Sequence, residues 1–166
     1  LATTMASSFA NQGQICLCGS RIFVQRGIYD KFKTAFVEKV SKRRVSHSLD
    51  PDAQLGAVVS KSHMEKVLSY VELAKEEGGT VLTGGTQVHL EGEYAGGYYI
   101  RPTVIEGLSF DCRTNQEEIF GPVVTIMPFD TEEEVLMMAN STEYGLAATV
   151  WTENLTRAHR IANELD

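Results

Sequence analysis

The chain has 166 residues, enough to bury one substantial hydrophobic core, and its 43% hydrophobic and 22% charged residues are ordinary for a globular domain. These values exclude a disordered or fibrous protein. The formal net charge of −7 argues against a nucleic-acid partner, because an acidic surface repels phosphate backbones. The apolar stretches are too short to span a membrane, and the start of the chain does not resemble a signal peptide.

The cysteines are few and odd in number: Cys16, Cys18 and Cys112. Such a count does not suit a disulfide framework in a chain of this size. It is typical of a reducing compartment, where a cysteine serves either as a small apolar residue or as a reactive thiol. We therefore expect a cytoplasmic protein.

The first half of the chain predicts three helices and one strand. Small and polar residues with Met5 and Phe9 spaced at i, i+4 predict a helix over residues 1–14. A β-branched and aromatic run predicts a strand over 21–25. Apolar residues at helical spacing predict helices over 28–41 and about 60–77.

The second half predicts alternating strands and helices. Asp130 and Thr131 open one helix, and Thr131 with Glu134 has the pattern of a capping box. Pro102 indicates an edge strand or a bend. The other predicted features are a strand at 81–82, a polar surface excursion over 86–97, an extended segment over 98–105, buried strands over 123–127 and 146–151, and a final helix with Leu155, Ala158, Ile161 and Leu165 on one face.

This alternation predicts the fold class. The predicted strands are continuous apolar runs, with no period-two pattern of polar residues. Both features are typical of a mostly parallel sheet with helices on both faces. We found no internal repeat and no linker that would divide the chain, so we expect an α/β fold. Both ends of the sequence fall inside helical patterns, which suggests a piece of a longer chain.

A glycine-flanked cysteine pair joins the first predicted helix to the first strand, in the segment Gly13-Gln14-Ile15-Cys16-Leu17-Cys18-Gly19. A cysteine at such a junction can be reached by a substrate, and its own backbone N–H can face an oxyanion. Spacing alone nevertheless favours a packing role, because free cysteines are usually packing residues. A metal site is weaker still, since no second cysteine pair or nearby histidine completes four ligands.

The stretch Phe9-Ala10-Asn11-Gln12-Gly13-Gln14-Ile15-Cys16 resembles the active-site signature of the aldehyde dehydrogenase family. In that family the cysteine after Gly-Gln-x is the nucleophile, so the resemblance selects Cys16. It also implies covalent catalysis, in which the thiolate adds to an aldehyde and forms a thiohemiacetal and then a thioester. The implied product is a carboxylic acid, and the implied cofactor is NAD, with NADP not excluded.

A second motif of this family is present in Glu117-Glu118-Ile119-Phe120-Gly121-Pro122-Val123. The resemblance assigns Glu118 to the hydroxyls of the nicotinamide ribose and Phe120 to a place beside the nicotinamide. Without it, Glu118 would be a solvated loop residue and Phe120 a core residue. Two further matches, at residues 97–104 and 144–148, extend the resemblance over nearly the whole chain.

The resemblance also indicates what lies outside the sequence. We expect residues 1–166 to be a partial, nucleophile-bearing catalytic domain, without the upstream cofactor domain and the C-terminal oligomerisation segment. The family's general-base glutamate and oxyanion asparagine belong to the upstream part. We therefore expect the isolated piece to oxidise no aldehyde, and the full-length protein to be a homo-oligomer, either a dimer or a tetramer.

Several functions remain open from the sequence. Residues 8–25, 128–130 and 144–151 are most similar to a branch that oxidises 2-aminomuconic semialdehyde in tryptophan (kynurenine) catabolism. Branches that oxidise retinal, betaine aldehyde or aliphatic aldehydes are alternatives. From other classes, a Cys-His thiol hydrolase would need no NAD, and a noncatalytic domain would keep only the fold. The four histidines are scattered without metal-ligand spacing, so we expect no metal.

Overall fold

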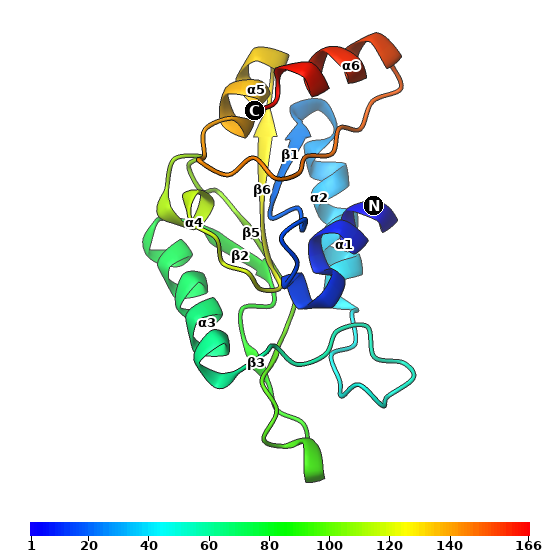
Figure 1. Ribbon diagram of the computed structural model, residues 1–166, viewed down its shortest axis with the longest axis vertical. Helices are drawn as coiled ribbons and strands as arrows, with labels where there is room; N and C mark the ends of the chain where they lie inside the picture. Colours follow the sequence, from blue (N-terminus) through cyan, green and yellow to red (C-terminus); the bar gives the residue numbers. More distant parts are fainter.

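The computed structural model describes all residues 1–166, and it is an α/β structure. The helices and strands alternate along much of the chain, as the sequence predicts (Figure 1). The elements are α1 (Ala2–Phe9), η1 (Ala10–Gly13), β1 (Arg21–Gln25), α2 (Arg26–Ser41), α3 (Lys61–Glu76), β2 (Thr80–Thr83), β3 (Gln87–Val88), η2 (Gly92–Tyr94), β4 (Tyr99–Ile100), β5 (Thr103–Glu106), α4 (Arg113–Gln116), β6 (Val123–Phe129), α5 (Glu132–Ala139) and α6 (Leu155–Glu164).

The main sheet has four strands in the order β1-β6-β5-β2. Strand β6 pairs in parallel with both β1 and β5, with Arg21 opposite Thr125 and Thr103 opposite Val123. Strand β2 joins the far side of β5 in the antiparallel direction. Two of the three strand pairs are thus parallel, which confirms the predicted mostly parallel sheet.

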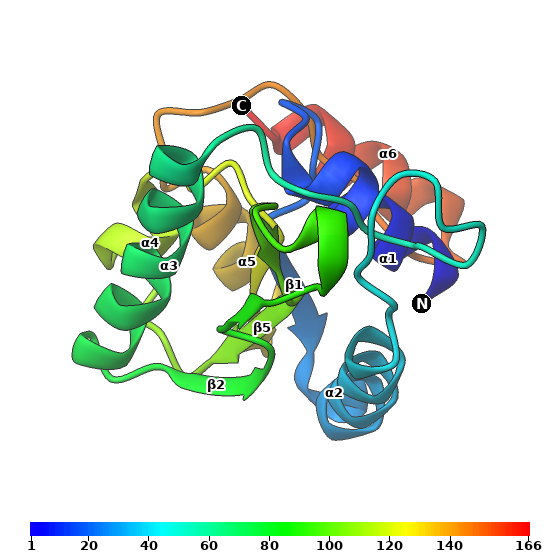
Figure 2. The ribbon, with the colours of Figure 1, turned by 90° about the horizontal axis from the view of Figure 1, so that it is seen from below.

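Helices cover both faces of this sheet, as predicted. Figure 2 shows α3 and α4 on one side of the strands and α2 on the other. The α3 side holds a core cluster that includes Val67, Val71 and Ile105. The opposite side holds a second cluster, in which Phe9 of α1 and Phe36 of α2 pack with Val124 of β6. Successive residues of a strand face opposite sides, so the continuous apolar run of β6 serves both cores.

Several predicted helix boundaries are confirmed. Helix α3 begins after Ser60, whose hydroxyl accepts a hydrogen bond from the backbone N–H of His63. Helix α5 begins after Thr131, which accepts from the N–H of Glu134 in the manner of a capping box. The predicted surface excursion forms the small β3–β4 hairpin and η2, which project beyond the sheet at the end opposite α5 and α6 (Figure 1).

The first predicted helix ends earlier than the sequence pattern indicates. We expected residues 1–14, but α1 ends at Phe9. Asn11, Gln12 and Gly13 all have positive φ, at 47°, 58° and 70°, which a right-handed helix cannot contain. Asparagine and glycine tolerate this left-handed region best, so Asn11 and Gly13 were the local signal for the break.

The predicted buried strand over residues 146–151 is wrong. This segment forms no strand, and Leu146 and Trp151 are both 64% exposed. A strand needs a neighbour that accepts and donates its ladder hydrogen bonds, and this segment pairs with neither edge strand of the sheet, β1 or β2. The apolar run instead crosses from α5 to α6 without ladder bonds (Figure 1).

Pro102 marks a bend and not an edge strand. It separates β4 from β5, while β5 itself lies inside the sheet between β6 and β2. None of the helices in the chain is both long and apolar enough to pass through a bilayer.

Candidate active site

Cys16 lies in a turn between η1 and β1, and its side chain is exposed. The turn is closed by the backbone N–H of Cys18, which donates to the carbonyl of Ile15 at 2.9 Å. The N–H of Gly19 donates to the carbonyl of Ser7 in α1 at 3.2 Å, so the loop is tied to the first helix. The N–H of Cys16 itself donates to no protein acceptor, so it is available to an oxyanion beside the thiol.

The turn before Cys16 is held in its left-handed shape by local hydrogen bonds. The side-chain amide of Asn11 donates to the carbonyl of Gln14 at 3.1 Å. The side-chain oxygen of Gln14 accepts from the backbone N–H of Val59 at 3.0 Å, which ties the loop to the segment before α3. These contacts fix the backbone on which Cys16 is carried.

The two sequence motifs meet at Gly13 and Gly121. A Cβ atom on Gly13 would lie 2.0 Å from the carbonyl oxygen of Gly121, so only glycine allows this approach. The reason is the sheet register: one motif directly precedes β1, the other directly precedes β6, and these strands are parallel neighbours. The backbone N–H of Thr125 also donates to the carbonyl of Ser20 at 2.9 Å.

The adjacent carboxylates Glu117 and Glu118 have different environments. Glu117 accepts hydrogen bonds from Arg113 at 2.7 and 3.1 Å and from the Tyr70 hydroxyl at 2.6 Å. The Arg113 guanidinium and the Tyr70 hydroxyl lower the pKa of Glu117 from its ordinary 4.5 to about 2. The Glu118 side chain is exposed and makes no hydrogen bond within the chain, so its carboxylate is free to accept from a ligand.

Helix α3 holds the backbone of the second motif. The Lys66 ammonium donates to the carbonyl of Glu118 at 2.9 Å, and the His63 Nε2 is 2.7 Å from the carbonyl of Phe120. Phe120 has a φ of 60°, which L residues rarely adopt. Its ring is half-buried and makes an edge-to-face contact with the His63 ring, with 6.2 Å between the ring centroids.

The comparisons with known proteins agree with this geometry. The family model for the aldehyde dehydrogenase family matches residues 1–166. The chain belongs to the aldehyde dehydrogenase family. The fold is also that of solved family members: an NAD+ complex of aldehyde dehydrogenase from Bacillus cereus matches with a TM-score of 0.92 and 41% identity over 98% of this chain and 32% of that one.

Two curated relatives illustrate the similarity. 2-Aminomuconic semialdehyde dehydrogenase from Mus musculus is 51% identical over 99% of this chain and 34% of its own length. Betaine aldehyde dehydrogenase from Mesorhizobium japonicum is 45% identical over 97% of this chain and 33% of its own length. The chain therefore spans about a third of the length of the curated relatives it matches.

The three cysteines of this aldehyde dehydrogenase chain are all free but differ in exposure. Burial raises the pKa of Cys18, whose thiol lies 3.7 Å from the carbonyl of Ala10. Burial also raises the pKa of Cys112, which lies beside Glu77. A raised pKa leaves less reactive thiolate at neutral pH, so Cys16 is the thiol best placed to react.

Sequence reasoning missed the α3 residues that contact the second motif. In the sequence, His63 is only one of four scattered histidines without metal-ligand spacing, and Lys66 and Tyr70 had no predicted role. Their spacing of three and four residues places them on one face of α3. That periodicity is visible in the sequence, but only the tertiary structure reveals that the face meets residues 117–120.

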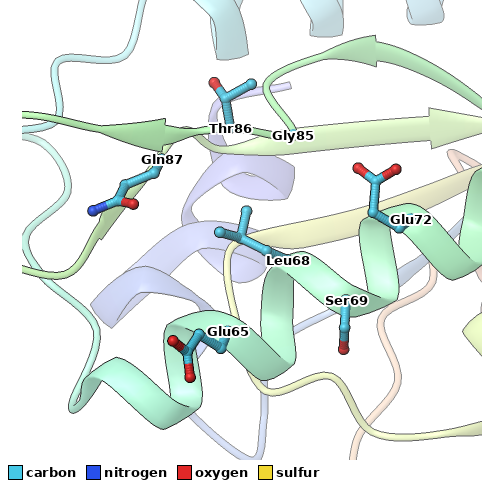
Figure 3. A pocket seen from close by; sticks show the side chains of 7 residues that line it. All are labelled: Glu65, Leu68, Ser69, Glu72, Gly85, Thr86 and Gln87. Carbon is cyan, nitrogen blue, oxygen red and sulfur yellow. The ribbon is translucent and has the colours of Figure 1, made fainter.

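Outside the two motifs, the structure shows few groups that could catalyse a reaction or bind a metal ion. A shallow groove lies between α3 and residues 85–87 (Figure 3), lined by Glu65, Leu68, Ser69, Glu72, Gly85, Thr86 and Gln87. It contains no cysteine or histidine and none of the residues of either motif. No group of three or more His, Cys, Asp or Glu side chains is arranged to hold a metal ion.

Proposed function

We propose that this chain is the nucleophile-bearing part of an NAD(P)-dependent aldehyde dehydrogenase and that Cys16 is its catalytic thiol. The contact between Gly13 and Gly121 carries the proposal, because it joins the cysteine loop to the loop of Glu118 and Phe120. A nucleophile and a dinucleotide-binding loop must lie side by side if a substrate on the thiol is to face the cofactor.

The residues present fit a bound nicotinamide ribose. Glu118 presents a free carboxylate, which can accept from both hydroxyls of a ribose diol. Phe120 presents an aromatic ring from a backbone that is held in place by α3. When bound, NAD+ supplies the acceptor for the hydride that leaves the aldehyde carbon.

In the proposed reaction the Cys16 thiolate adds to the aldehyde carbon and forms a thiohemiacetal on Sγ. The Cys16 backbone N–H donates to the resulting oxyanion and stabilises its charge. After oxidation the acyl group remains on Sγ as a thioester. Attack by water then releases the carboxylic acid and returns the thiol.

For the substrate we propose 2-aminomuconic semialdehyde. The curated relatives of that name from mouse, cow, human and zebrafish are 46–51% identical to this chain over 99% of its length. Betaine aldehyde is an alternative, because a relative named for it is 45% identical. The proposed setting is a full-length, homo-oligomeric protein in the cytoplasm, and the three free cysteines agree with a reducing compartment.

The test is NADH formation by the natural full-length protein that carries these residues. Wild type, Cys16→Ala and Cys112→Ala would be assayed with an acidic semialdehyde and with betaine aldehyde, with NAD+ and with NADP+. We expect wild type and Cys112→Ala to form NADH and Cys16→Ala to form none. The preferred aldehyde then decides the substrate, and the preferred dinucleotide decides the cofactor.

Other outcomes would refute the proposal. Full activity in Cys16→Ala would make Cys16 a structural residue. Ester hydrolysis with no NADH or NADPH formed from any aldehyde would indicate a thiol hydrolase. No turnover at all would indicate a noncatalytic member of the family.

A further inference from the structure

We propose that His63 is a positioning residue that sets the cofactor affinity of this enzyme by holding the Phe120 peptide in its left-handed conformation. This inference rests on the proposed function, since it concerns the same dinucleotide site. The geometry that carries it is the 2.7 Å contact between His63 Nε2 and the carbonyl oxygen of Phe120.

The Phe120 backbone needs an external partner to stay where it is. Apart from Asn11 and Gln12, it is the one residue other than glycine with a positive φ. Asn11 stabilises its own turn through its side chain, whereas a phenylalanine side chain has no hydrogen-bonding group. The hydrogen bond to its carbonyl must therefore come from another element, and His63 on α3 supplies it.

The donor itself is fixed in place. A carbonyl oxygen can only accept, so Nε2 of His63 carries the proton in this contact. The backbone of His63 lies in the first turn of α3, where its N–H donates to the Ser60 hydroxyl at 3.2 Å. The His63 and Phe120 rings also make an edge-to-face contact. The same side chain therefore restricts the movement of both the Phe120 peptide and the Phe120 ring.

The next turn of the helix fixes the following residue. A Cβ on Gly121 would lie 2.5 Å from Cγ2 of Val67, so Gly121 packs directly on α3. Residues 63 and 67 thus hold two consecutive residues of the loop, one by a hydrogen bond and one by van der Waals contact. Without the His63 bond, Gly121 would remain in place while the Phe120 peptide could rotate toward ordinary φ values.

Rotation of that peptide would move the Phe120 ring and the neighbouring Glu118. We therefore expect loss of the His63 donor to weaken dinucleotide binding, while Cys16 on the other loop keeps its reactivity. A general loss of structure would instead lower stability and thiol reactivity together.

The experiment measures the Kd for NADH by fluorescence in the natural full-length protein. The variants are His63→Ala, His63→Met, His63→Gln and, as a matched control, His89→Ala, an exposed histidine without a side-chain hydrogen bond. We expect alanine and methionine to raise Kd by about fivefold or more, the size of one lost hydrogen bond, and to raise the KM for NAD+ more than they lower kcat. Glutamine, which keeps an N–H donor, should restore most of the affinity.

The outcomes separate this inference from the proposed function. If wild type binds no dinucleotide, both are overturned. If wild type binds NADH and the alanine and methionine variants bind it equally well, or if glutamine binds as poorly as alanine, only the role of His63 is overturned. Methionine keeps the length and packing of the side chain, so it decides the question if the alanine variant does not fold. Alkylation of Cys16 by iodoacetamide should proceed at the wild-type rate in every folded variant.

Discussion

Gly13 and Gly121 touch backbone to backbone, although they are 108 positions apart in the sequence, and a single added Cβ on Gly13 would lie 2.0 Å from the Gly121 carbonyl oxygen. Gly13 lies in η1 before β1 and Gly121 lies just before β6, and these two strands are parallel neighbours. It is the place where the cysteine loop meets the Glu118–Phe120 loop.

This contact makes a steric prediction for Gly13→Ala. The substitution adds a clash with a carbonyl that is part of the backbone, and it also puts alanine at a φ of 70°. We expect the free energy of unfolding of the full-length protein to fall by at least about 2 kcal/mol. Gly27→Ala is the control, because a Cβ there meets nothing within 4 Å and the residue lies in helix α2, where alanine should stabilise by roughly 0.5–1 kcal/mol. Equal effects in thermal unfolding would contradict the prediction.

Gly121→Ala should behave differently, because its clash is with the tip of a side chain. A Cβ on Gly121 would lie 2.5 Å from Cγ2 of Val67, and we expect a loss of about 1–3 kcal/mol from overpacking. Val67→Ala removes the clashing methyl groups, so the double variant should lose less stability than the sum of the single variants. A double-mutant cycle by chemical denaturation measures this coupling, and strict additivity would count against the packing described here.

The adjacent residues Glu117 and Glu118 should have different effects: Glu117 should contribute to stability and Glu118 to cofactor binding. The pKa of Glu117 is lowered to about 2 by Arg113 and Tyr70, so its contribution to stability is complete above the ordinary pKa of 4.5 and is lost as the pH falls toward 2. Glu117→Gln should therefore lower the Tm at pH 7, and the difference from wild type should shrink as the pH falls below 4.5 and vanish below about pH 2.

Glu118→Gln is the matched variant. The Glu118 side chain is exposed and unpaired, so we expect its Tm to follow wild type at every pH while the KM for NAD+ rises. A Tm loss in Glu118→Gln equal to that in Glu117→Gln would show that the two carboxylates do not have the separate roles assigned to them.

The cysteines predict an order of chemical labelling. Cys16 is exposed, whereas burial raises the pKa of Cys18 and of Cys112 and so reduces their thiolate fraction at pH 7 to 8. Iodoacetamide should modify Cys16 first, and peptide mass spectrometry over time would measure the order. Faster labelling of Cys18 or Cys112 would contradict the assignment of Cys16 as the reactive thiol.

The sequence predicted most of the fold because its signals are local. The α3 helix, the buried run of β6 and the Thr131 cap of α5 all follow from spacing and capping residues within one segment. The predicted strand over 146–151 failed for the opposite reason. An apolar run becomes a strand only if it pairs with another strand, and pairing is a property of the whole sheet.

For the candidate site, too, some features could be predicted from the sequence and others only from the tertiary structure. The two motifs pointed to Cys16, Glu118 and Phe120 without any coordinates, because family resemblance is carried by the order of residues along the chain. The tertiary structure alone decided that Gly13 meets Gly121, that Glu117 is ion-paired while Glu118 is free, and that His63 holds the Phe120 peptide. Each of these depends on which strands become neighbours and which face of α3 packs against the loop, and such long-range contacts leave no local pattern in the sequence.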